Sequence, residues 1–222
     1  MSTLFLIRHG QASLGAEDYD NLSPLGREQS ALLGPRFTAR ETVPDQIYVG
    51  PRRRHHQTLD AARGAWSERP IQGLDLLDEQ QCPEVLRANE ETLRERLAID
   101  PDDTKAYLQF FRRGSKMWVR GEVETPPEFE SWNVFRSRID SAMDHLRQDI
   151  EDPDARVAVF TSGGVVAAAV GHVLGLDDEK TIELSWSIYN ASVTTLHLSR
   201  HGFALMGFNE LPFVDRRLVT FV

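Results

Sequence analysis

Near its N-terminal end the sequence has an apolar run that leads directly into a basic pair and a glycine. Leu4 to Ile7 are four consecutive apolar residues, followed by Arg8, His9 and Gly10. Such a run predicts a buried β-strand, and glycine turns the chain easily where a strand ends. Because open α/β sheets bind ligands beyond the carboxyl ends of their strands, the pair is predicted to lie at a site. An imidazole that can attack phosphorus, beside a guanidinium that can hold phosphate oxygens, favours chemistry on an anion.

Arginines and histidines also follow a second predicted strand. Residues 46–49 predict this strand, Gly50 and Pro51 break it, and residues 52–56 (three arginines and two histidines) begin a predicted helix. The N-terminus of a helix favours anions, because its first N–H groups have no partner within the helix. Three consecutive arginines, like an arginine–histidine pair, are also typical of a solvated surface. The rest of the chain has to decide between these two interpretations.

Two other segments complete the N-terminal part of the predicted sheet. A helix over residues 24–37, with Ser23 as its N-cap and a proline in its first turn, would cover the first strand. Residues 71–77 alternate weakly and predict a third strand. This strand would deliver Asp78 and Glu79 to the same edge of the sheet.

Residues 80–152 differ in character from the rest of the chain. They are rich in charge and predict helices near residues 84–97, 105–113 and 129–150. We therefore expect a helical cap inserted into a single domain that spans residues 1–222. The aromatic residues of the insertion are more typical of a small core of its own than of a ligand site: Phe110, Phe111, Trp118, Phe129, Trp132 and Phe135.

The sheet is predicted to resume at residues 156–160, a continuous apolar run typical of a central parallel strand. Residues 161–164 (Thr-Ser-Gly-Gly) and a helix over residues 165–174 follow, and the glycines let backbone N–H groups approach a phosphate. Residues 192–198 and 203–208 predict an antiparallel hairpin. The order of elements predicts an α/β fold with three α/β/α layers, a mainly parallel sheet and an antiparallel edge.

Composition excludes several classes of protein. Of the 222 residues, 41% are hydrophobic and 27% are charged, as in an ordinary globular domain. No apolar run reaches the roughly 18 residues of a membrane span, and the first run is too short for a signal peptide. The net charge of −9 argues against binding to nucleic acids or anionic membranes. Cys82 is the only cysteine, which excludes an internal disulfide, so we expect the protein in the reducing cytoplasm.

Five short motifs are spread over nearly the whole chain. Residues 8–10 read Arg-His-Gly, residues 22–29 fit Leu-Ser-x-x-Gly-x-x-Gln, and residues 51–58 fit Pro-x-x-Arg-x-x-Gln-Thr. Residues 77–79 read Leu-Asp-Glu, and residues 190–194 begin with Asn-Ala-Ser. Together these motifs resemble those of the histidine phosphatase superfamily, also called the phosphoglycerate mutase-like family.

The resemblance implies a role for the residues that carry it. His9 would be the nucleophile and form a phosphohistidine, while its other ring nitrogen donates to a backbone carbonyl. Arg8 and Arg54, which the motif singles out from the neighbouring arginines, would clamp the phosphoryl oxygens. Glu79 would protonate the leaving oxygen and later activate water. No cofactor and no metal ion is implied, and the remaining substrate-binding positions are Gln11, Ser162 and Gly163.

Two positions depart from the pattern of the family. Ser162 stands where the family has a second histidine, and a hydroxyl cannot carry the positive charge of a protonated imidazole. Losing such a donor typically costs about 100- to 1000-fold in rate. Either the protein is slow, or a nearby His55 or His56 compensates, or the protein only binds. In addition, residues 80–83 (Gln-Gln-Cys-Pro) replace a Gly-x-Trp-Glu-Gly run.

Two classes of function therefore remain open. The first is a metal-independent phosphatase that hydrolyses phosphomonoesters of a small metabolite or a phosphoprotein through His9. The second is a catalytically weak relative that binds phosphorylated ligands or partners in the same pocket. A phosphoglycerate mutase is disfavoured, because mutases retain the second histidine and must shield the phosphoenzyme from water. No oligomeric state is predicted, and the insertion is expected to roof a pocket formed by Arg8, His9, Arg54, Glu79 and the Gly163 N–H.

Overall fold

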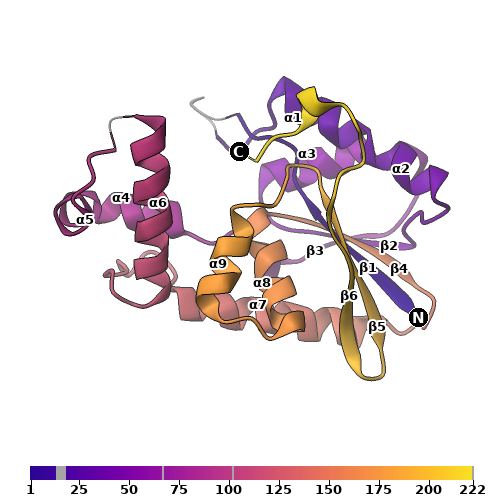
Figure 1. Ribbon diagram of the computed structural model, residues 1–222. Coiled ribbons are helices and arrows are strands. Elements are labelled where there is room, and N and C mark those ends of the chain that lie inside the picture. The colour runs from indigo at the N-terminus through magenta and orange to yellow at the C-terminus, as the bar shows by residue number, and fades with distance from the viewer. Residues whose placement is uncertain (14–18, 67, 102, 222) are drawn as a thin grey trace.

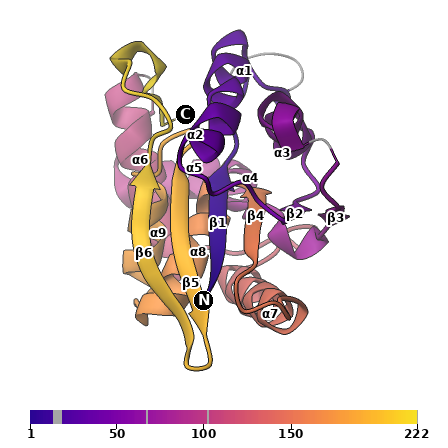
Figure 2. The ribbon, with the colours of Figure 1, turned by 90° about the vertical axis from the view of Figure 1, so that its right-hand side faces the viewer.

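The computed structural model describes residues 1–13, 19–66, 68–101 and 103–221. Within these residues a six-stranded sheet has the order β3-β2-β4-β1-β5-β6, which Figure 2 shows from right to left. Its strands are β1 (Ser2–Arg8), β2 (Gln46–Val49), β3 (Ile71–Gly73), β4 (Arg156–Thr161), β5 (Val193–Ser199) and β6 (Gly202–Glu210).

The directions of the strands follow from their pairing. β1 is parallel to β4, and β2 is parallel to both β4 and β3. β5 is antiparallel to β1, and β6 is antiparallel to β5. The predicted α/β fold, with a mainly parallel sheet and an antiparallel edge, is confirmed.

Different helices cover the two faces of the sheet (Figure 1). In β1, Phe5 and Ile7 pack into one layer, while Leu4 and Leu6 pack into the other, because side chains alternate along a strand. The first layer holds α1 (Pro24–Ala31), α2 (Leu33–Ala39) and α3 (Arg53–Ala62). The second holds α7 (Trp132–Asp149), α8 (Gly163–Leu174) and α9 (Asp178–Ser185).

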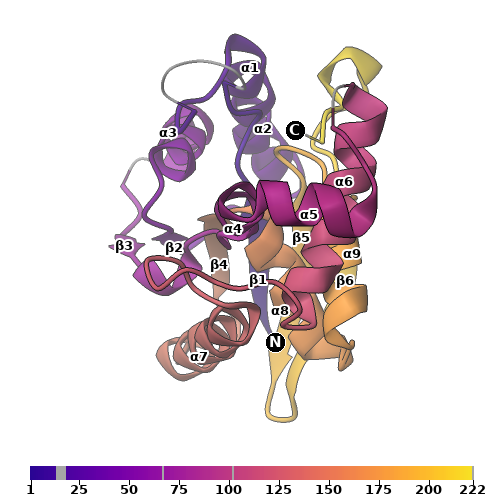
Figure 3. The ribbon, with the colours of Figure 1, turned by 90° about the vertical axis from the view of Figure 1, so that its left-hand side faces the viewer.

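Three more helices extend beyond the second layer and lie in front of the sheet in Figure 3. They are α4 (Cys82–Ala88), α5 (Glu90–Leu97) and α6 (Thr104–Val119). Trp118 of α6 meets Trp132 of α7 edge to face, with ring centroids 5.5 Å apart. Both rings belong to a core that is continuous with Leu4 and Leu6 of the sheet. The separate core expected for residues 80–152 is therefore wrong, because their buried aromatic residues share one continuous core with the sheet.

Several predicted elements have different bounds in the structure. The single helix predicted over residues 24–37 is divided at Leu32, because Pro35 lacks the N–H that would continue the first helix. The third strand ends at Gly73, which pairs with Val49, the last residue of β2. Beyond this pair no strand is available for pairing, and the chain forms the short 3₁₀ helix η2 (Asp75–Leu77). The helix predicted near residues 84–97 is two helices, and α9 was not predicted.

Candidate active site

The candidate site lies where two neighbouring parallel strands end. Arg8 of β1 pairs with Thr161 of β4, and the N–H of His9 donates to the carbonyl of Thr161 over 2.9 Å. His9 and Ser162 therefore leave the sheet side by side at its carboxyl edge. This is the position where open α/β sheets bind their ligands.

Hydrogen bonds to both ring nitrogens fix the state of His9. Nδ1 lies 2.7 Å from the carbonyl oxygen of Gly10, which can only accept, so Nδ1 carries the proton. Nε2 lies 3.1 Å from Nε of Arg54, which can only donate, so Nε2 keeps its lone pair. Burial, together with the charges of Arg54 and Arg8, holds the pKa of His9 well below its usual value. The ring is neutral, and its lone pair on Nε2 accepts from Arg54.

Two guanidinium groups, the buried Arg54 and the half-buried Arg8, lie beside this imidazole. Arg54 is 5% exposed and lies on α3, where Nη1 donates to Oδ1 of Asp20 over 2.8 Å. Arg8 donates to the carbonyl of Ile188, and burial lowers its pKa to about 10. Two cations beside a neutral ring form a region that favours an anion. Sequence reasoning did not identify Asp20, which no motif marks.

Thr58 connects the turn after His9 with helix α3. Its hydroxyl accepts from the N–H of Gly10 over 3.1 Å and donates to the carbonyl of Arg54 over 2.7 Å. Thr58 belongs to the motif over residues 51–58, and its position one helical turn after Arg54 explains the spacing. The motif thus fixes the guanidinium and the nucleophile relative to each other.

The structure brings His55, and not His56, to the site. Nε2 of His55 lies 2.6 Å from Oγ of Ser162, and both side chains are fully buried. The rings of His55 and His9 have centroids 5.8 Å apart. Burial and the charge of Arg54 hold the pKa of His55 well below its usual value. His56 is exposed on the same helix.

Glu79 lies at the N-terminus of α8. Its Oε2 accepts from the N–H of Gly164 over 3.2 Å, and its Oε1 accepts from the N–H of Gln80 over 2.9 Å. A Cβ on Gly164 would lie 2.1 Å from Oε1, so only glycine allows this approach. A carboxylate at this position is favoured by the helix dipole. Glu79 also interacts electrostatically with Arg8.

Two charged side chains hold the loop that carries Glu79. Arg52, the N-cap residue of α3, binds both carboxylate oxygens of Asp78, and Oδ1 of Asp78 accepts from the N–H of Glu79 over 2.8 Å. Arg138 of α7 donates to the carbonyls of Leu76 and Asp78 over 2.8 and 2.9 Å. The carboxylate is therefore positioned by both helical layers. Neither Arg52 nor Arg138 was among the predicted site residues.

The two remaining predicted positions, Gly163 and Gln11, have different contacts. Gly163 begins α8, and a Cβ placed on it would lie 3.3 Å from Nε of Arg8, so its backbone lies beside the guanidinium. The side-chain oxygen of Gln11 accepts from the hydroxyl of Ser23, the N-cap of α1, over 2.9 Å. Its backbone N–H donates to Oε1 of Gln29 over 2.8 Å.

Gln29 and Asn190 hold the backbone around His9. The buried amide of Gln29 also donates to the carbonyl of Leu218 over 2.7 Å and to the hydroxyl of Thr220 over 2.8 Å. Asn190 donates to the carbonyl of His9 over 3.4 Å and accepts from the Thr220 hydroxyl over 2.9 Å. Both residues stand in the motifs, but only the structure shows what they contact.

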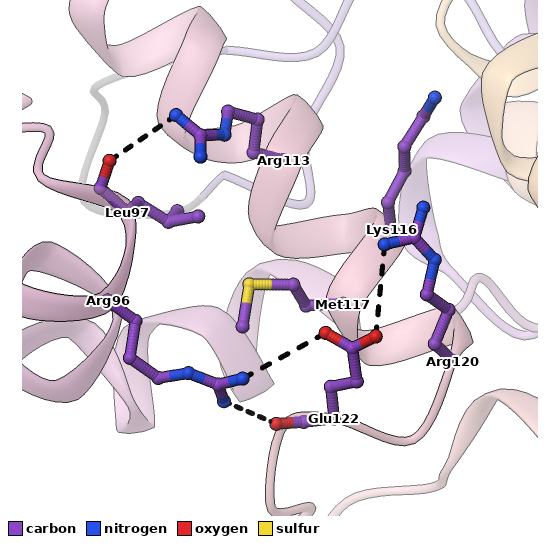
Figure 4. A pocket seen from close by; sticks show the side chains of 7 residues that line it. All are labelled: Arg96, Leu97, Arg113, Lys116, Met117, Arg120 and Glu122. Atoms are coloured by element: carbon purple, nitrogen blue, oxygen red, sulfur yellow. Dashed lines mark hydrogen bonds and ion pairs between the residues drawn. The ribbon is translucent and has the colours of Figure 1, made fainter.

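A separate cavity of about 370 Å³ lies on α5, α6 and the turn after α6, and none of its residues belongs to the site (Figure 4). Four cationic side chains line it with Glu122, yet Arg96 and Arg120 pair with Glu122, and Lys116 pairs with Glu183. Across the described ranges, no three His, Cys, Asp or Glu side chains are grouped as metal ligands. In the same part of the chain, every helix is too short or too polar to span a membrane.

Comparison with known proteins agrees with this fold. Solved structures with the same fold include YhfR from Bacillus stearothermophilus (TM-score 0.69, 19% identity, 95% of this chain and 98% of that one). A second is the α-ribazole phosphatase from Shigella flexneri (TM-score 0.68, 14% identity, 96% of this chain and 100% of that one). A third is a histidine-to-alanine mutant of phosphoserine phosphatase from Entamoeba histolytica in complex with phosphoserine (TM-score 0.66, 16% identity, 94% of this chain and 97% of that one). No curated protein matches the chain. The model of the histidine phosphatase superfamily (branch 1) matches residues 4–211, and the chain belongs to this family.

Proposed function

We propose that the protein is a phosphatase that hydrolyses phosphomonoesters, with His9 as its nucleophile. The observation that carries the proposal is the state of the His9 ring. Its Nδ1 proton is held by the Gly10 carbonyl, and its Nε2 accepts from the buried Arg54, with the charge of Arg8 also acting on the ring. A neutral imidazole with a free nitrogen among fixed cations is suited to attack on a phosphoryl group.

In the first half of the reaction, Nε2 of His9 forms a bond to phosphorus while the bond from phosphorus to the leaving oxygen breaks. Arg54 would turn its Nε–H from the imidazole to a phosphoryl oxygen, and Arg8 would bind a second one. Glu79 would give a proton to the leaving oxygen, so it must be protonated when the substrate is bound. The charge that develops on the phosphoryl oxygens is offset by the two arginines.

In the second half, water attacks the phosphorus and the bond to Nε2 breaks. Glu79, now a carboxylate, would take the proton from the attacking water. This returns His9 to its neutral form and releases inorganic phosphate. No step in this scheme requires a metal ion or a cofactor.

The site and the printed names of similar structures support a proposal for the substrate class. The relatives include proteins described as α-ribazole phosphatase and phosphoserine phosphatase, whose names indicate small phosphomonoesters. We propose a small phosphorylated metabolite or a phosphoprotein as substrate, under a cap formed by residues 80–152. Nucleic acids and membranes are not proposed as partners, given the net charge of −9. The buried, unpaired Cys82 is consistent with the cytoplasm as the proposed compartment.

A second candidate function is binding of phosphorylated ligands without efficient turnover. The observation in its favour is Ser162, which supplies a hydroxyl where the family has an imidazole. Such a protein would use the same arginines to bind a phosphoryl group.

One experiment separates the two candidates. A panel of phosphomonoesters is assayed with a chelator present, using wild type, His9→Ala and, as a control, the exposed His56→Ala. We expect release of phosphate by wild type and His56→Ala but not by His9→Ala. Turnover that depends on added magnesium would contradict the proposal. Saturable binding of a phosphomonoester without release of phosphate would favour the binding protein.

A further inference from the structure

The reaction scheme leaves one buried pair of polar side chains without a task. Nε2 of His55 and Oγ of Ser162 are 2.6 Å apart, and neither side chain has any exposed surface. The pair joins the first turn of α3 to the residue that precedes α8. A buried polar pair is costly unless its hydrogen bond is made, so its position beside the nucleophile needs a reason.

Both members of the pair lie next to His9. The ring of His55 is inclined by 33° to the ring of His9, with centroids 5.8 Å apart. Ser162 follows Thr161, whose carbonyl accepts the N–H of His9. The hydroxyl thus contacts a second imidazole at the same edge of the sheet as the proposed nucleophile.

The ring of His55 is held tightly in place. A Cβ on Gly50 would lie 2.6 Å from Nδ1 of His55 and 2.9 Å from the carbonyl oxygen of Leu77. The glycine that breaks the strand therefore also makes room for this ring. The ring therefore packs against this glycine on its Nδ1 side, with Nε2 directed at Ser162.

We propose that His55 is a positioning residue that acts through Ser162: its Nε2–H donates to Oγ, which directs the hydroxyl proton of Ser162 to a phosphoryl oxygen bound at His9. This proposal rests on the proposed function, because it assigns a donor within the same site. A serine hydroxyl has a single proton. If Oγ donated that proton to His55, none would remain for the phosphoryl group. When Oγ accepts from Nε2–H instead, the hydroxyl proton is free to point at the ligand.

The direction of this hydrogen bond can be measured in the wild-type protein. In a sample with ¹⁵N-labelled histidine, Nε2 of His55 is expected to give the signal of a protonated ring nitrogen when orthovanadate is bound. A signal from an unprotonated Nε2 would overturn the proposal. This measurement requires no substitution and no turnover.

The coupling between the two residues is tested with single and double variants. His55→Leu and Ser162→Ala are each expected to lower kcat about 10- to 100-fold with a small change in KM, because the donor matters most where charge develops. The double variant should be no slower than Ser162→Ala, and His55→Gln, which keeps a side-chain N–H, should recover part of the rate. Additive losses, or an effect on KM alone, would contradict a role through Ser162. The exposed His56→Leu is the control.

A further pair of variants tests whether the two side chains share one space. Ser162→His alone should lower activity, because the ring of His55 fills the space that the new ring needs. Adding His55→Ala should recover activity relative to Ser162→His. Full activity of the single variant would contradict a shared space, and thermal unfolding shows whether each variant is folded.

Affinity for orthovanadate separates failure of this proposal from failure of the proposed function. If wild type hydrolyses no phosphomonoester, calorimetry of orthovanadate binding replaces the kinetics. Weaker binding by His55→Leu that disappears in the Ser162→Ala background supports the pair, even if the protein is not a phosphatase. Equal affinity of wild type and His55→Leu overturns the proposal.

Discussion

The Nε–H of Arg54 points at Nε2 of His9 over 3.1 Å, so the nitrogen proposed to attack phosphorus is held by the guanidinium proposed to receive the phosphoryl oxygens. Asp20 in turn holds this guanidinium through Nη1. A carboxylate, an arginine and an imidazole therefore form a chain that ends at the reactive atom.

Substitutions along this chain should have graded effects on kcat/KM. Arg54→Ala removes a donor from the transition state and should lower kcat/KM about 100- to 1000-fold. Asp20→Asn keeps the size of the side chain but loses its charge, and we expect a loss of roughly 10-fold, typical of groups that orient a functional residue. The exposed neighbour Arg53→Ala serves as control. Equal losses in Arg53→Ala and Arg54→Ala would show that the position of Arg54 is not special.

The site of phosphorylation should be Nε2 of His9. Denaturing the enzyme during turnover should trap phosphate in an acid-labile, base-stable linkage, as expected for phosphohistidine. Because Nδ1 donates to the Gly10 carbonyl, ³¹P NMR should show the Nε2 isomer and not the Nδ1 isomer. Phosphoserine at Ser162 would identify a different nucleophile.

Stability should fall when the pH falls below about 6.5, the ordinary pKa of histidine. The pKa values of His9 and His55 are well below this value in the folded protein, so the unfolded chain binds more protons at acidic pH. Each residue then lowers the free energy of unfolding by at most about 1.4 kcal/mol per pH unit, and the loss is absent above the unfolded pKa. Urea unfolding of wild type between pH 7.5 and 5 measures the slope.

Variants show which histidine causes this change of the free energy of unfolding with pH. His55→Gln should reduce it by about 1.4 kcal/mol per pH unit, whereas His56→Gln, at an exposed position, should leave it unchanged. A slope that is the same in wild type and His55→Gln would contradict a neutral, buried His55.

Gly164→Ala should impair catalysis without harming the fold. The added methyl would lie 2.1 Å from Oε1 of Glu79 and displace the carboxylate, while alanine itself favours helix formation by about 1 kcal/mol. We expect a loss of about 100-fold in kcat, similar to that of Glu79→Gln, because general acid catalysis contributes at least this much. Gly73→Ala, whose Cβ would meet nothing within 4 Å, is the matched control. Normal turnover by Gly164→Ala would argue against Glu79 as the acid.

Most of the sheet could be predicted from sequence, because buried strands show as apolar runs. The strands at residues 46–49 and 156–160 were found nearly at their observed bounds. The motifs located His9 and Arg54, whose roles depend on local turns and on one helix. The predicted bounds were wrong where they depend on strand pairing or on a single proline. The third strand ends where β2 ends, and Pro35 divides the predicted helix over residues 24–37.

Contacts between side chains from distant elements could not be predicted. Nothing in the sequence places His55 against Ser162 and His56 in solvent, because the choice depends on how α3 is rotated about its axis over β4. Asp20 likewise has no sequence signal, since its role comes from the folding of its loop onto the N-terminus of α3.

The amide of Gln29 gives the last residues of the chain a part in the site. Its Nε2 binds Leu218 and Thr220, while its Oε1 receives the N–H of Gln11, two residues after the proposed nucleophile. The family model ends at residue 211, before these partners. A protein trimmed to residue 211 would keep every proposed reactive group, but Nε2 of Gln29 would lose these two acceptors. Leu218 and Thr220 therefore help to hold Gln29 in place and, through it, the loop that follows His9.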